Sequence, residues 1–189
     1  ALILYREIGD RQGEGRTLIG FGAIADNLGQ YPQALDYYEQ SLVISREIGD
    51  RAVEGLILNN IGGVYDKLGQ YPEALDYCEQ SLVISREIED RAFEGLTLNN
   101  IGEIYRKLGQ YPEALDYYEQ ALVISREIGD HAIEGVTLNN IGLTYDKLGQ
   151  YPEALDYHEQ SLVVSREIGD RVVEGRTLNN IGEVYRGLG

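Results

Sequence analysis

The sequence repeats itself at a fixed interval of 40 residues. The pentapeptide Leu-Asn-Asn-Ile-Gly occurs at 58–62 and returns unchanged at 98–102, 138–142 and 178–182. Residues 51–90 and 91–130 differ at only 8 of 40 positions. A period of about 20–50 residues is typical of stacked-repeat folds, in which each unit buries its apolar face against its neighbours. The repeat therefore constrains the fold more than length does.

Each unit has the pattern of two amphipathic helices joined by a tight turn. In the unit 51–90, apolar residues recur at steps of three and four, in two series separated by Gly69 and Pro72. Gly69 can end a helix in the left-handed conformation, and Pro72 suits the first turn of the next helix. The pattern predicts a helix A near 51–68 and a helix B near 72–88.

Two positions in this unit carry local predictions. Gly62 lies on the apolar face of helix A, where glycine costs about 1 kcal/mol relative to alanine. We expect a close approach of helix B to offset that cost. Glu89 stands at a turn where the other units have glycine. Since the turn needs a left-handed residue, we expect strain at Glu89.

The spacing of Leu58, Ile61, Gly62, Tyr65, Gly69, Tyr71 and Ala74 resembles the tetratricopeptide repeat. The chain departs from that family in having Leu58 in place of Trp and a period longer than about 34 residues. The longer unit is similar to the repeats of polarity adaptors, kinesin light chains and bacterial arrays joined to signalling domains. The resemblance covers essentially the whole chain. It implies an all-α fold, a right-handed α-solenoid of tandem helix hairpins.

The register of the repeat predicts one array over 1–189. It would consist of half a helix B at 1–8, four A–B pairs at 11–48, 51–88, 91–128 and 131–168, and a lone helix A at 171–188. Because the chain begins within a repeat and without methionine, we expect it to be a fragment of a longer protein. Without capping helices, Ile181, Val184, Tyr185 and Leu188 should lie partly bare, which favours head-to-tail self-association.

The net charge and the cysteine content exclude several partners. A formal charge of −16 repels phosphate groups, so neither nucleic acid nor an anionic membrane is an expected partner. No apolar run reaches the roughly 20 residues needed to cross a bilayer. The single cysteine, Cys78, cannot form an internal disulfide and fits the reducing cytoplasm.

The sequence shows no arrangement of residues typical of catalysis. The two histidines fall in structural positions: His131 replaces an arginine at a helix start, and His158 shares a helix B position with Tyr38, Cys78 and Tyr118. We find no cluster with metal-ligand spacing and no phosphate-binding glycine loop. We therefore predict a protein that is not an enzyme and needs no cofactor or metal.

The family resemblance places the A helices on the concave surface, where we expect a peptide or protein ligand to bind. The residues expected to point inward recur at steps that share one helical face. They are Asn59, Asn60, Asn99, Asn100, Asn139, Asn140, Asn179 and Asn180, together with Lys67, Lys107, Lys147, Glu103 and Arg176.

The paired asparagines need a compensating role, because each is up to about 0.7 kcal/mol worse than alanine in a helix. A carboxamide both donates and accepts, so it can bind the backbone of a peptide of any sequence. The resemblance implies that role for the second asparagine of each pair, which is Asn60, Asn100, Asn140 or Asn180. For the first member we favour hydrogen bonds between helices instead.

Two further alternatives remain open at this stage. The alternating charges Asp66, Arg106, Asp146 and Arg186 predict ion pairs between neighbouring units, each contributing about 0–1 kcal/mol. Besides a peptide-binding scaffold, the array could be a self-associating spacer or the regulatory arm of a larger signalling protein.

Overall fold

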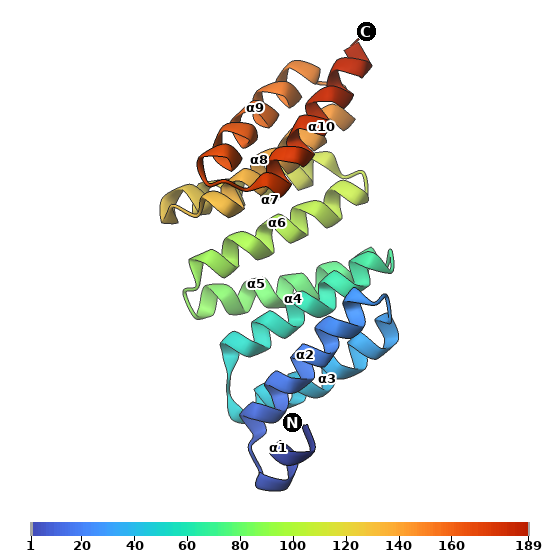
Figure 1. The fold of residues 1–189 in the computed structure, drawn as a ribbon, viewed down its shortest axis with the longest axis vertical. Helices are drawn as coiled ribbons and strands as arrows, with labels where there is room; N and C mark the ends of the chain where they lie inside the picture. The colour runs from blue at the N-terminus through green and yellow to red at the C-terminus, as the bar shows by residue number, and fades with distance from the viewer. Residues whose placement is uncertain (1, 189) are drawn as a thin grey trace. The chain divides into compact units, whose positions relative to one another are not determined.

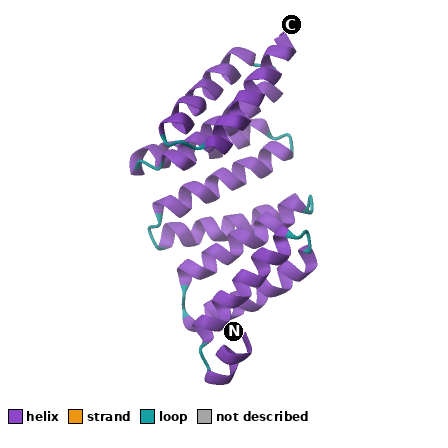
Figure 2. Cartoon of the chain, in the orientation of Figure 1, coloured by secondary structure: helices purple, strands orange, loops and turns teal. Residues whose placement is uncertain are grey.

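The structure is a computed structural model that describes residues 2–188. Within this range all regular structure is helical, as the sequence predicts (Figures 1 and 2). The helices are α1 (Leu2–Ile8), α2 (Arg11–Asn27), α3 (Tyr31–Ile48), α4 (Arg51–Lys67), α5 (Tyr71–Glu87), α6 (Arg91–Lys107), α7 (Tyr111–Ile128), α8 (His131–Lys147), α9 (Tyr151–Glu167) and α10 (Arg171–Leu188). Residue 1, the first of the expected half helix at 1–8, and residue 189, the last of the expected array, lie outside the described residues.

The chain divides into two compact units, Ala1–Asp90 and Arg91–Gly189. In the first unit α2 pairs with α3 and α4 pairs with α5, while α3 packs on α4 and α1 on α2. In the second unit α6 pairs with α7 and α8 with α9, while α7 packs on α8 and α10 on α9 (Figure 1). Helices α6 and α10 both contact α8, so the A helices of this unit lie side by side.

Glycine and aspartate together set the joints between hairpins. Gly49 ends α3 with a φ of 71°, and Asp50 then caps α4 by accepting a hydrogen bond from the backbone N–H of Val53 at 3.1 Å. Glu89 has a φ of 57° and is the single non-glycine residue with positive φ in the range 2–188. The strain predicted at this turn is therefore present, since a side chain is disfavoured in that region.

The A and B helices of each hairpin approach closely at one glycine. A Cβ added to Gly62 would lie 2.6 Å from Cys78 Sγ and 3.1 Å from the carbonyl oxygen of Ala74. A Cβ on Gly102 would likewise lie 2.7 Å from the ring of Tyr118. The close approach predicted at Gly62 is confirmed, because no larger residue fits without moving helix B.

Within each compact unit, a glutamate near the start of an A helix links that helix to the B helix before it. Glu54 of α4 accepts a hydrogen bond from Arg46 Nε of α3 at 2.8 Å and from Arg51 Nη1 at 2.5 Å. Burial opposes ionisation of Glu54, but the hydrogen bonds from Arg46 and Arg51 outweigh it and hold its pKa below the usual value. Equivalent pairs form at Glu14, Glu134 and Glu174.

The apolar side chains of the last helix do not all lie bare. The expectation for Val184 is wrong, because only 1% of its surface is exposed in the face of α10 that packs on α9. Tyr185, next to it, is 58% exposed, and Leu188 is also exposed. Adjacent residues of a helix point about 100° apart, so burial of one leaves its neighbour in solvent.

The glycine contact can be tested with two adjacent residues. Gly62→Ala should destabilise the protein by about 1–3 kcal/mol, because the new methyl group would overlap α5. Gly63→Ala is the matched control: its Cβ would meet nothing within 4 Å, so it should stabilise the helix by up to about 1 kcal/mol. Urea denaturation of both variants measures the difference. Equal effects from the two substitutions would contradict the close approach.

Candidate functional site

A cavity of about 350 Å³ opens along the A helices of the second unit. Helix α6 contributes Asn99, Asn100, Glu103 and Arg106, helix α8 contributes Val136, Asn139, Asn140 and Leu143, and helix α10 contributes Arg176 and Asn180. These residues come from the face of helix A that the sequence predicts to point inward. We refer to this cavity as the Asn groove.

The remaining candidate residues lie elsewhere. Lys107, Lys147 and Asn179 are not among the residues that line the Asn groove, and Asn59, Asn60 and Lys67 lie on α4 of the first unit. Lys67 pairs with Asp26 of α2 at 2.6 Å, and Lys147 lies 3.6 Å from Asp146. These two lysines are thus engaged in ion pairs. A role in peptide binding stays a prediction for all the candidates.

Asn99 and Asn139, the first asparagines of two pairs, connect neighbouring A helices of the second unit. Asn99 Oδ1 accepts hydrogen bonds from Thr137 Oγ1 at 3.3 Å and from Asn140 Nδ2 at 3.2 Å. Asn139 Oδ1 does the same with Thr177 Oγ1 at 3.2 Å and Asn180 Nδ2 at 2.9 Å. Asn99 and Asn139 are buried. The hydrogen bonds favoured for the first asparagine are therefore present at both positions.

Asn140 and Asn180, the second asparagines of two pairs, each use one N–H of the carboxamide within the array. Asn140 and Asn180 donate their Nδ2 groups to Asn99 and Asn139. Their Oδ1 atoms accept no hydrogen bond from any residue between 2 and 188, and both side chains are partly exposed. Each Nδ2 also has a second N–H group, so the expectation that this amide both donates to a ligand and accepts from it stays a prediction.

Charged groups at the edge of the Asn groove pair within their own helices. Glu103 accepts two hydrogen bonds from Arg106, at 2.6 and 3.0 Å, and one from Tyr118 Oη at 3.2 Å. Arg186 pairs with Glu183 in the same way, and the partner of Asp146 is Lys147. The inter-unit pairs expected of Arg106, Asp146 and Arg186 are therefore wrong. Arg106 and Arg186 pair with a residue three positions away, and Asp146 pairs with the next residue.

We call the hydrogen bonds that Asn99 and Asn139 accept from the next A helix the asparagine ladder. The role of its threonines was not predicted, although the sequence carries a signal for it. The first complete repeat has Ile19 where later repeats have asparagine, and the second repeat has Ile57 where the other repeats have threonine. Ile57 is buried in the core of the first unit, and Ile19 packs against the same cluster. The joint loss of both polar partners indicates that Asn and Thr at these positions bond across helices.

Comparison with family models assigns these repeats. Tetratricopeptide repeat models match residues 17–52, 53–127, 93–167 and 134–189. The chain belongs to the tetratricopeptide repeat family. This finding confirms the resemblance and the solenoid fold class that it implied. None of the helices in the described part of this tetratricopeptide chain is long and apolar enough to span a membrane.

Solved structures share the tetratricopeptide fold at low sequence identity. BtubC (BKLC) from P. vanneervenii has a TM-score of 0.83 at 21% identity, over 97% of this chain and 76% of that one. The nearly identical repeats of a putative kinesin light chain from Podosopora anserina have a TM-score of 0.72 at 18% identity, over 90% of this chain and 85% of that one. A Rap protein complexed with competence and sporulation factor has a TM-score of 0.81 at 18% identity, over 93% of this chain and 53% of that one. This chain therefore spans about half the length of the Rap protein. A search of curated proteins finds no similar sequence.

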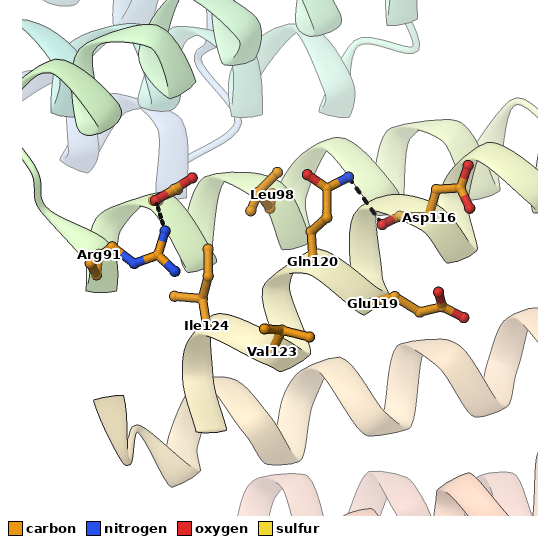
Figure 3. Close-up of a pocket in the computed structure, with 8 residues that line it drawn as sticks. Arg91, Leu98, Asp116, Glu119, Gln120, Val123 and Ile124 are labelled. Carbon is orange, nitrogen blue, oxygen red and sulfur yellow. Dashed lines mark hydrogen bonds and ion pairs between the residues drawn. The ribbon is translucent and has the colours of Figure 1, made fainter. Parts of the chain in front are cut away.

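A second cavity of about 580 Å³ lies on the tetratricopeptide hairpin α6–α7 (Figure 3). Figure 3 shows Arg91, Asp116, Glu119 and Gln120 around it. Arg91 donates to Glu94 at 2.5 Å, and Gln120 donates to the carbonyl oxygen of Asp116 at 3.2 Å. Arg91 also donates to Glu127 of α7 at 2.7 Å, so the guanidinium in this cavity already has two carboxylate partners. The described residues hold no group of three or more metal-ligating side chains here or elsewhere.

His158 and Cys78 are buried as packing residues, whereas His131 lies exposed beside Glu134. His158 is fully buried, neither ring nitrogen has a hydrogen-bond partner within 2–188, and burial lowers its pKa to about 4 despite the opposing charge of Asp146. Burial, reinforced by Asp66, raises the pKa of Cys78 to about 12. A protonated thiol is a poor nucleophile, and a buried imidazole with a pKa of about 4 is a weak base.

The ladder can be tested by a double-mutant cycle. Asn99→Ile should cost about 1–3 kcal/mol, because the buried hydroxyl of Thr137 loses its acceptor. The double variant Asn99→Ile with Thr137→Ile reproduces the apolar pair Ile19–Ile57 of the first unit and should recover most of that stability. Chemical denaturation gives the coupling energy. Additive losses would show that the two side chains do not interact.

Burial of His158 predicts a pH dependence. In the unfolded chain the imidazole has a pKa near 6.5, whereas the folded value is about 4. Stability should therefore be complete above about pH 7 and fall by about 1–2 kcal/mol towards pH 5, where only the unfolded chain gains the proton. His158→Cys, the residue found at position 78, is the control. Denaturation curves of the variant should lose this slope; an unchanged slope would assign it to other groups.

Proposed function

We propose that the chain is a protein–protein interaction scaffold that holds an extended peptide in the Asn groove. The observation that carries this proposal is the pair of partly exposed Oδ1 atoms of Asn140 and Asn180, which face solvent without a hydrogen-bond donor from the described chain. An extended peptide presents backbone N–H groups that need such acceptors. Acceptors of this kind recognise a backbone without requiring a particular side chain.

The ladder supports the proposal by fixing these acceptors in advance. Each Oδ1 belongs to a carboxamide whose Nδ2 is held by the neighbouring helix. A ligand then binds without immobilising a free side chain, which would cost about 0.5–1.5 kcal/mol each time. Neighbouring helices pack about 10 Å apart and an extended chain rises about 3.3 Å per residue. One repeat would therefore contact about three residues of the ligand.

The comparisons support an interaction role in general terms. The matched family is a repeat family, and one fold neighbour is a Rap protein complexed with competence and sporulation factor. The proposal includes no enzymatic activity and no cofactor. It also includes a reducing compartment such as the cytoplasm, since the lone thiol of Cys78 is buried and protonated.

The proposal can be tested with a library of random peptides of about nine residues, because each of the three A helices of the Asn groove would contact about three. Peptides selected on the immobilised chain should bind Asn140→Ala with Asn180→Ala about tenfold more weakly, because two hydrogen bonds of about 0.5–1.5 kcal/mol each are lost. Asn179→Ala is the matched control: it changes the same residue type on α10 but outside the groove lining. Fluorescence anisotropy measures the affinities. Failure to enrich any peptide, or full affinity in the double variant, would refute the proposal.

A second candidate function is head-to-tail self-association, either as a spacer or within a longer signalling protein. Exposed apolar side chains on both terminal helices favour it. Ile3 and Ile8 of α1 are 75% and 65% exposed, and Tyr185 and Leu188 are exposed on α10. Sedimentation over a concentration series should show a rising mass, because contact would bury these side chains. A monomer at every concentration would exclude this function.

A further inference from the structure

The repeats differ most in chemistry at the positions that line the Asn groove. From residue 51 onward, the asparagine pairs and most of helix B are identical between units. One groove position, by contrast, is Leu56, Leu96, Val136 and Arg176 in successive units, and another is Gly63, Glu103, Leu143 and Glu183. The groove therefore combines a constant row of amides with side chains that change from repeat to repeat.

These variable side chains give the groove a defined order. On α6 the carboxylate of Glu103 is fully engaged by Arg106 and Tyr118. On α8 the groove is lined by the apolar Val136 and Leu143. On α10 Arg176 is exposed and forms no ion pair or side-chain hydrogen bond with any residue of the described range. The order is a neutralised ion pair, an apolar surface, and one unpaired guanidinium.

We propose that the Asn groove selects peptides in which an acidic side chain lies about three residues from an apolar one. This inference rests on the proposed function, since it assigns side-chain preferences to the same groove. Arg176 occupies on α10 the position that Val136 occupies on α8, and neighbouring helices are about 10 Å apart, or about three extended residues. The guanidinium binds a carboxylate with paired hydrogen bonds, and Val136 with Leu143 shelters an apolar side chain.

The local charge opposes the preference that the whole chain would impose. A net charge of −16 attracts basic peptides to the surface in general. Selection of an acidic residue at one position must therefore come from a specific contact rather than from the overall field. Because the contact is exposed to solvent, its contribution should weaken as salt is added.

The chain contains its own matched control for Arg176. Arg16 occupies the equivalent position on α2, and it is likewise exposed and without an ion pair in the described range. It is followed by Ile19 and Gly20 in place of the asparagine pair. The two arginines share charge and helix position, but Arg176 lines the Asn groove with Asn180, whereas the helix of Arg16 carries no asparagine pair. Substitution of Arg16 should therefore leave peptide selection unchanged.

The test repeats the random-peptide selection on the wild-type chain, Arg176→Leu and Arg16→Leu, where leucine is the residue found at positions 56 and 96. Peptides from the wild type and from Arg16→Leu should carry Asp or Glu about three residues from an apolar residue. The consensus peptide should bind about tenfold more tightly than its Asp→Lys form at low salt, with the difference lost in Arg176→Leu and reversed in Arg176→Glu. Because Arg176 is exposed, circular dichroism should show unchanged helicity in both variants.

The outcomes separate this inference from the proposed function. Enriched peptides without an acidic preference, or a preference that survives Arg176→Leu, would overturn the inference while the Asn groove stands. Equal loss in Arg16→Leu and Arg176→Leu would also overturn it, because bulk charge would then explain the preference. Failure to enrich any peptide would overturn both.

Discussion

Within each compact unit, the stacking of the repeats depends on a carboxylate at the joint between a B helix and the next A helix. Glu54 receives Arg46 from the end of the preceding B helix and Arg51 from the start of its own A helix. Both arginines remain about half exposed, so the pair avoids the full desolvation that makes buried ion pairs costly. The same contacts recur at Glu14, Glu134 and Glu174. By fixing where each A helix begins, they set the spacing on which a regular groove depends.

The asparagine ladder is not required for stacking A helices. In the first unit Ile19 packs against the apolar cluster that contains Ile57. In the second unit the corresponding positions hold Asn99 and Thr137, which form a hydrogen bond instead. Asparagine inside a helix is the less stable choice. Its presence in four successive A helices therefore calls for a role beyond packing, which the unpaired Oδ1 atoms of Asn140 and Asn180 supply under the proposed function.

Sequence reasoning succeeds here where the cause is local. The period, the turn at Gly69–Pro72, the close approach at Gly62 and the strain at Glu89 each follow from one or two residues and their backbone preferences. It fails where several partners compete. Arg106 could reach a neighbouring unit or Glu103, and the choice depends on side-chain rotamers that no repeat pattern encodes. Val184 was misjudged for a similar reason, since its burial depends on how α10 rotates on α9.

The composition of the groove is also coupled to the helix behind it. Tyr118 on α7 donates its hydroxyl to Glu103 at the groove edge, so this B-helix position supports a polar groove residue. In the next repeat the groove residue is Leu143, which has no acceptor, and the B-helix position holds His158 with both nitrogens unpaired. A polar groove residue is therefore paired with a polar residue of helix B in the repeat of Glu103, but not in the repeat of Leu143. Replacing Leu143 with glutamate to change the ligand preference would consequently also raise the pKa of His158, because the carboxylate would stabilise the charged imidazole.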